Sequence, residues 1–141
     1  MSVDLIVYLP RTSMPTPSRW AQAIRDAGFP VDLESDFDPD TATGFRPCQF
    51  RGILSGFEYY SGPLGEHERQ EVGAPPGCDF SVSLVTHSDL REFATSLIAA
   101  SVLCRVSDGV FYDPQEDERR TAAGILEWAH QQLALIEEHF D

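Results

Sequence analysis

The feature that most constrains the fold is a change of hydrophobic period between residues 79 and 107. Residues 79–86 alternate between apolar and small polar side chains, which predicts a half-buried strand. From Leu90 onward the apolar residues recur at helical spacing, and Asp89 with Glu92 matches a helix-capping box. A strand with one apolar face and a helix with one apolar stripe bury those surfaces against each other. The sequence therefore predicts a sheet covered by helices.

Similar patterns predict further elements along the chain. Strands are expected at residues 3–9, 31–34, 79–86 and 110–112, and one bulged strand or a tight strand pair at 50–60. Helices are expected at residues 17–27, 90–106 and about 118–140, and loops at 36–47 and 61–77. The prediction is a single α+β domain over residues 1–141. Its sheet is mixed or antiparallel, with about five strands and three helices mainly on one face.

The charge balance excludes some partners. Acidic residues outnumber basic ones by 23 to 10, which gives a net charge of -13. Such a surface repels nucleic acid and anionic membranes, so we expect no direct binding to either and favour a basic protein partner. The three cysteines form no CxxC pair, and the N-terminus lacks a signal-peptide pattern. We therefore predict a cytoplasmic protein with reduced thiols.

A row of acids follows the second expected strand. Its members occupy alternate positions and are Asp32, Glu34, Asp36, Asp38 and Asp40. In an extended chain they share one face at roughly 6.5–7 Å spacing. Two interpretations stay open: a solvated strand edge that runs into a loop, or a row of anions that meets a basic partner. A calcium loop is not favoured, because Thr41 replaces its glycine and Pro47 its bidentate glutamate. The acids near residues 113–118 are expected at a helix N-terminus.

The segment Gly56-Phe-Glu-Tyr-Tyr60 suggests a contact surface. Adjacent tyrosines cannot both face the core of a regular strand, so one of them is expected to be exposed. An exposed tyrosine either anchors an interface or lies over a neighbouring strand. The predicted partner-binding residues combine this segment with nearby acids and are Asp36, Asp38, Asp40, Glu58, Tyr59, Tyr60, Glu66 and Glu68.

No catalytic signature is present in the sequence. It contains no HExxH, no GxSxG, no phosphate-binding glycine loop and no cysteine beside a histidine. We therefore predict no catalytic residue, no metal ligand and no cofactor. One alternative is a pocket for an anionic small molecule, lined by Arg11, Arg46, Arg51 and the tyrosine pair. Another is a homodimer that forms through the aromatic strand.

The second half of the chain carries a family resemblance. The residues that carry it, together with Gly56–Tyr60, are Gly109, Val110, Tyr112, Asp113, Pro114, Gln115 and Trp128. Over residues 56–130 the chain resembles small bacterial immunity proteins of polymorphic toxin systems. The resemblance implies a cytoplasmic, non-catalytic inhibitor that binds and blocks a toxin domain, and it brings no catalytic residues.

Overall fold

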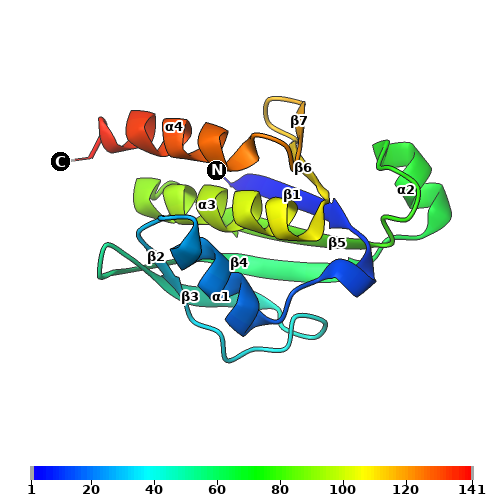
Figure 1. Cartoon of the computed structure of the whole chain (residues 1–141), viewed down its shortest axis with the longest axis horizontal. Coiled ribbons are helices and arrows are strands. Elements are labelled where there is room, and N and C mark those ends of the chain that lie inside the picture. Colours follow the sequence, from blue (N-terminus) through cyan, green and yellow to red (C-terminus); the bar gives the residue numbers. More distant parts are fainter. Residues whose placement is uncertain (1, 141) are drawn as a thin grey trace.

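The structure, a computed structural model, describes residues 2–140 and is built on one sheet (Figure 1). The sheet has seven strands in the order β2-β3-β4-β5-β1-β6-β7, and every neighbouring pair is antiparallel. The strands are β1 (Val3–Leu9), β2 (Val31–Leu33), β3 (Gly44–Phe50), β4 (Ile53–Pro63), β5 (Phe80–Thr86), β6 (Val110–Asp113) and β7 (Glu118–Thr121). The helices are α1 (Pro17–Asp26), α2 (Glu66–Val72), α3 (Leu90–Ser107) and α4 (Ile125–Glu137), with a short 3-10 turn at Arg11–Ser13.

Three of the helices cover one face of the sheet. Figure 1 shows α1, α3 and α4 in front of the strands, whereas α2 lies beyond one end of them. The small residues of α3 allow it to lie close to β4, where Thr95 Oγ1 is 2.9 Å from Ser55 Oγ inside the core. The indole Nε1 of Trp20 donates to the carbonyl of Ala99, at 3.0 Å, and so ties α1 to α3. The main core lies between these helices and the sheet.

The predicted change from a strand to a helix between residues 79 and 107 is confirmed. Phe80, Val82 and Leu84 of β5 are buried, and the serines between them are only half-buried. Asp89 caps α3, because its carboxylate accepts a hydrogen bond from the Glu92 amide at 2.9 Å. Thr16 caps α1 in the same way, with the Arg19 amide 3.2 Å from its hydroxyl. The α+β class is therefore confirmed, and helices do gather on one face.

The predicted count of about five strands and three helices is wrong, because β3, β7 and α2 were not predicted. Residues 36–47 were expected to be a loop, yet β3 begins at Gly44 and forms a hairpin with β4. Within residues 50–60, Phe50 ends β3 and residues 53–60 belong to the single strand β4, so the predicted strand pair does not lie within this segment; the partner of β4 lies at residues 44–50. Residues 61–77 were also expected to be a loop, but they hold the end of β4 and helix α2. Gly44 and Pro47 in β3, and Gly62 and Pro63 at the end of β4, mimic loop signals, since glycine and proline usually weaken strands.

The last helix was predicted to begin near residue 118 and instead begins at Ile125. Residues 118–121 form β7, which pairs with β6. The turn between these strands is stabilised by Asp113, whose carboxylate accepts hydrogen bonds from the amides of Gln115 and Glu116 at 3.0 and 3.3 Å. The acids at 113–118 therefore lie in a β-hairpin, and the predicted helix-dipole role for them is wrong.

The opposite face of the sheet is covered only in part. A small second core contains Tyr8, Leu64, Ala74 and Cys78, so the segment around α2 packs on that face at one end. Among residues 2–140, no helix covers the rest of the face, on β2 to β5 (Figure 1). We call this region the open sheet face. Its outward residues are Asp32, Phe45, Pro47, Gln49, Leu54, Glu58, Tyr60, Ser81, Ser83 and Val85.

Candidate protein-binding surface

Large apolar side chains are exposed on the open sheet face. Leu54 is 74% exposed, Phe45 45% and Tyr60 41%. Phe45 lies on β3, and Leu54 and Tyr60 lie on the neighbouring strand β4. In the register of this pair, Gln49 is opposite Leu54 and Phe45 is opposite Glu58. Single exposed apolar residues are common on protein surfaces, but several on one flat face mark an interaction surface.

A glycine on β4 leaves room for the Phe45 ring. Gly56 has a φ of 148°, which L side chains rarely adopt, and a Cβ there would lie 2.6 Å from Phe45 Cζ. The same Cβ would lie 2.4 Å from the carbonyl oxygen of Arg46. The phenyl ring of Phe45 therefore lies across β4, over the position where a side chain is missing. This explains the glycine that begins the Gly56–Tyr60 segment.

A carboxylate lies next to this aromatic surface and is held by two neighbours. The hydroxyl of Tyr60 donates to Glu58 Oε1 at 2.5 Å, and His87 Nε2 is 2.6 Å from Glu58 Oε2. The pKa of Glu58 is lowered, chiefly by the hydrogen bond that Tyr60 donates and next by the hydrogen bond with His87. The bond between Tyr60 and Glu58 also raises the pKa of Tyr60. Glu58 thus stays ionised and oriented on an exposed face. The group places an anion beside an aromatic ring on the open sheet face.

The predicted acidic row does not continue as a strand. Strand β2 ends at Leu33, and two carboxylates of the row are used to shape the following loop. Glu34 accepts from the Asp36 amide at 2.6 Å, and Asp38 accepts from the Asp40 amide at 2.9 Å. The five acids are all exposed, as predicted, but they follow a curved loop instead of one strand edge.

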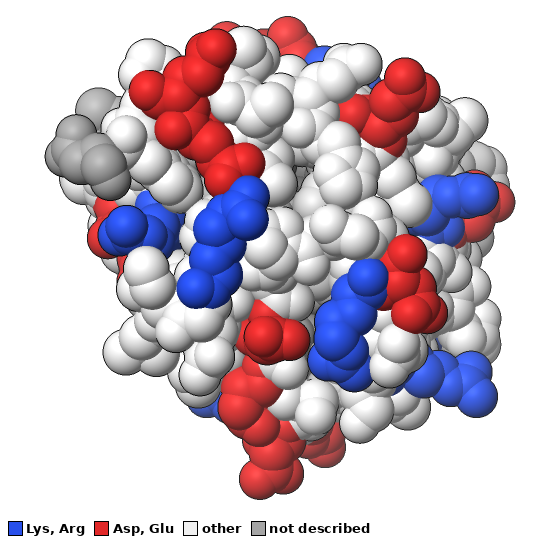
Figure 2. Space-filling model, turned by 60° about the vertical axis from the view of Figure 1, so that its left-hand side comes forward, with Lys and Arg blue, Asp and Glu red and all other residues white. Residues whose placement is uncertain are grey.

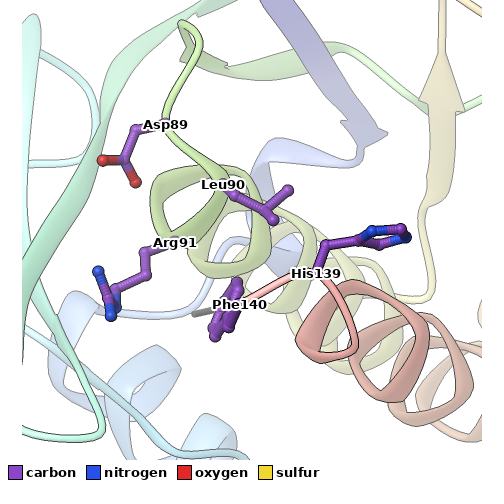
Figure 3. Close-up of a pocket in the computed structure, with 5 residues that line it drawn as sticks. All are labelled: Asp89, Leu90, Arg91, His139 and Phe140. Atoms are coloured by element: carbon purple, nitrogen blue, oxygen red, sulfur yellow. The ribbon is translucent and has the colours of Figure 1, made fainter.

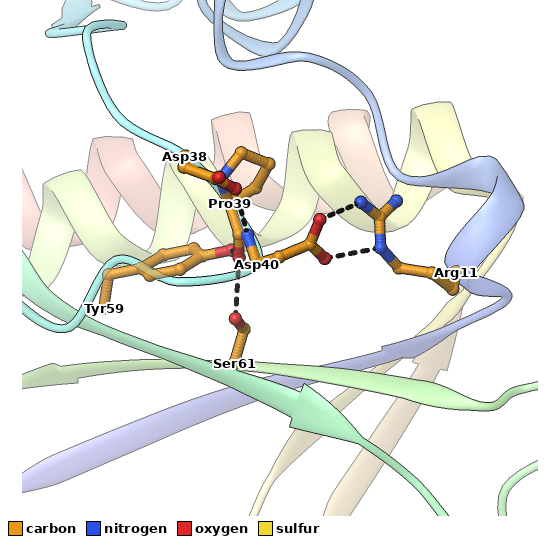
Figure 4. A network of polar contacts seen from close by, with 6 residues as sticks. All are labelled: Arg11, Asp38, Pro39, Asp40, Tyr59 and Ser61. Atoms are coloured by element: carbon orange, nitrogen blue, oxygen red, sulfur yellow. Dashed lines mark hydrogen bonds and ion pairs between the residues drawn. The ribbon is translucent and has the colours of Figure 1, made fainter.

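This loop lies on the helix side of the sheet (Figure 4). Its Phe37 ring packs against Tyr59 in the core, with ring centroids 5.3 Å apart, and the Tyr59 hydroxyl donates to the carbonyl of Pro39 at 2.6 Å. Arg11 forms an ion pair with Asp40 and donates from Nε at 2.6 Å. This hydrogen bond from Arg11 lowers the pKa of Asp40. Asp38 and Asp40 therefore lie on the helix side of the sheet, away from the open sheet face, and Asp40 is paired with Arg11.

The tyrosine pair divides between the two faces, as predicted. Tyr59 is fully buried, and burial raises its pKa to about 12. Tyr59 was predicted to contact a partner, but its position in the core removes it from any contact surface. Tyr60 is the exposed member.

The last two predicted contacts lie on α2. Glu66 forms an ion pair with Arg69 at 2.7 Å, and both Glu66 and Glu68 are exposed. Helix α2 lies beyond the end of the sheet (Figure 1), so these acids are at its margin. The eight predicted residues thus occupy three places, and only Glu58 and Tyr60 belong to the open sheet face.

The arginines of the alternative pocket do not converge. Arg51 is in the β3–β4 turn and pairs with Glu137 at 2.5 Å, whereas Arg11 lies over the Phe80 ring, near the opposite end of β4. Strand β4 has 11 residues, which corresponds to about 35 Å. Six of the ten arginines lie over aromatic rings, and they are Arg11, Arg46, Arg51, Arg91, Arg119 and Arg120. These contacts give the arginines a structural role.

A hollow of about 180 Å³ lies between the start of α3 and the end of α4 (Figure 3). Its polar side chains do not converge: Asp89 and Arg91 point to one side and His139 to the other. Asp89 is occupied as the cap of α3, and the Arg91 guanidinium lies 5.5 Å from the Phe140 ring centroid. Among the residues that line this hollow, no nucleophile is paired with a base.

Charge is mixed on the face that Figure 2 shows, where acidic and basic side chains lie next to each other on a neutral background. Among residues 2–140, no group of three or more His, Cys, Asp or Glu side chains could hold a metal ion. Within the same residues, no helix is long and apolar enough to cross a membrane.

Sequence reasoning missed several residues of the open sheet face. Phe45 was assigned to a loop, and Leu54, Val85 and His87 were not selected as contacts. The alternation of β4 contained a usable signal, since Leu54, Glu58 and Tyr60 share one parity and Phe57 and Tyr59 the other.

The fold and this surface together define an α+β protein with one partly uncovered sheet face. Comparisons with protein-family models, with curated proteins and with solved structures find no match for this chain.

Proposed function

We propose that this chain is a non-catalytic inhibitor of the immunity type, which binds a basic toxin domain through the open sheet face. The observation that supports it best is the group of exposed apolar side chains, Leu54, Phe45 and Tyr60, next to the carboxylate of Glu58. Interfaces commonly use aromatic anchors at their centre and charged residues around them. The resemblance of residues 56–130 to immunity proteins points to the same function.

The net charge determines the kind of partner. A protein with a formal charge of -13 attracts basic surfaces over long distances and repels other acidic ones. Self-association through the open sheet face is disfavoured, because each copy brings the same excess of acids. A toxin domain with a cationic cleft, such as a nuclease, fits this electrostatic requirement.

The two predicted regions then have separate roles. The loop acids Asp36 and Asp38 are exposed but lie on the other side of the sheet, so they act through long-range attraction and raise the association rate. Tyr60 and Leu54 act through direct contact and lower the dissociation rate. We place the protein in the cytoplasm, where its three buried, unpaired cysteines remain reduced.

Growth rescue tests this proposal. The chain is co-expressed with the protein encoded beside it in the native host, and the wild type is expected to restore growth. Replacing Leu54 and Tyr60 with Ala should abolish rescue. The matched control replaces Val106 and Leu135, which are exposed apolar residues on α3 and α4, and should rescue normally. Unchanged toxicity with the wild type, or full rescue by the variant with both open-face residues replaced, would contradict the proposal.

A further inference from the structure

A hollow of about 350 Å³ occupies one end of the open sheet face, where β2, β3 and β4 meet. One wall is apolar and contains Leu54 and Pro47. At 74% exposure, Leu54 is the most exposed of the large apolar side chains on this surface. Such a wall suits the aliphatic stem of a long side chain.

The other wall carries two carboxylates, those of Asp32 and Glu34. No arginine or histidine of residues 2–140 forms an ion pair with either carboxylate. One oxygen of Glu34 accepts the Asp36 amide, and this bond fixes the direction of the side chain. Asp40, by contrast, forms an ion pair with Arg11. The hollow thus combines an apolar wall with negative charge that no arginine or histidine of residues 2–140 neutralises.

We propose that this hollow receives an arginine side chain of the basic partner. The stem packs on Leu54 and Pro47, and the guanidinium reaches Asp32 and Glu34. Arginine fits better than lysine, because its planar group presents five donors and is less strongly hydrated. The inference rests on the proposed function and deepens it, since it names the residue type that the partner presents at this end of the open sheet face.

An NMR titration of the full chain tests this inference. The probe is the peptide acetyl-Ala-Arg-Ala-amide, and the control peptide carries the uncharged isostere citrulline in place of arginine. Shifts are expected at the Leu54 methyls and the Gln49 amide, with the citrulline peptide at least tenfold weaker. Leu54→Ser should weaken the arginine peptide several-fold through the loss of the apolar wall.

Two double variants of equal charge separate the hollow from general attraction. Asp32→Asn with Glu34→Gln should weaken the arginine peptide at least tenfold, whereas Asp36→Asn with Asp38→Asn should weaken it less than twofold. Equal weakening by both variants, or shifts that centre elsewhere, would overturn the inference. Concentration-dependent dimerisation that only the first double variant removes would also overturn it, because the occupant would be a second copy.

The result is independent of the growth rescue. If the peptide fails to bind while the Leu54 and Tyr60 replacements still abolish rescue, the arginine site is wrong and the proposed function stands. If the peptide binds at the hollow while those replacements rescue normally, the hollow is a cation site and the proposed function fails.

Discussion

The two faces of one strand have different roles. On β4, Phe57 and Tyr59 point toward the helices and are fully buried, whereas Glu58 and Tyr60 point the other way and remain partly exposed. The covered face stabilises the fold through apolar burial. The open face contributes little to stability and presents aromatic and acidic groups to solvent. A single alternating sequence can therefore specify the core and the candidate interface together.

The largest expected effect comes from removing a ring on the covered face. Phe57→Ala should lower the free energy of unfolding by about 3–5 kcal/mol, because it leaves a cavity next to Trp20. Leu54→Ala on the open face should change it by less than about 0.5 kcal/mol, since that side chain is mostly in water. Urea unfolding followed by circular dichroism measures both. Similar losses at the two sites would mean that the faces do not differ as described.

An intermediate effect on stability is expected at Gly56, the glycine of β4 over which the Phe45 ring lies. Gly56→Ala should cost about 1–3 kcal/mol, because alanine is strained at this φ and its Cβ meets the Arg46 carbonyl. It should also displace the Phe45 ring, which near-ultraviolet circular dichroism and the Phe45 ring resonances would detect. Gly62→Ala, also on β4 but with open space around the site, is the matched control. A neutral Gly56→Ala would show that the ring does not lie over this position.

The smallest expected effect concerns the loop on the helix side. Asp40→Asn removes an ion pair between two half-exposed groups and should cost about 0.5 kcal/mol near neutral pH. Because Arg11 lowers the pKa of Asp40 in the folded state, the unfolded state binds the proton more readily. The stabilisation is therefore complete above about pH 4 and lost as the pH falls through the folded-state pKa.

Unfolding measured between pH 2 and 7 checks this. The difference between the wild type and Asp40→Asn should shrink toward low pH. A difference that stays constant over that range would assign the effect to something other than the ion pair.

Much of the fold was predictable from local patterns, and the candidate site was predictable only in part. The β5 alternation, the cap at Asp89 and the split of Tyr59 and Tyr60 follow from spacing alone. Strand β3 was missed because Gly44 and Pro47 disrupt its pattern, and only pairing with β4 makes it a strand. The side on which the acidic loop lies depends on Phe37 packing against Tyr59. Such long-range contacts leave no periodic signal in a sequence.

The most direct test is methyl cross-saturation NMR on the chain bound to the basic toxin domain that we propose as its partner. The account predicts that saturation reaches the methyl groups of Leu54 and Val85 on the open sheet face. The methyl groups of Val106 and Leu135, which are exposed on the helices, should be unaffected. Saturation of the helical methyls with no effect at Leu54 and Val85 would contradict the account.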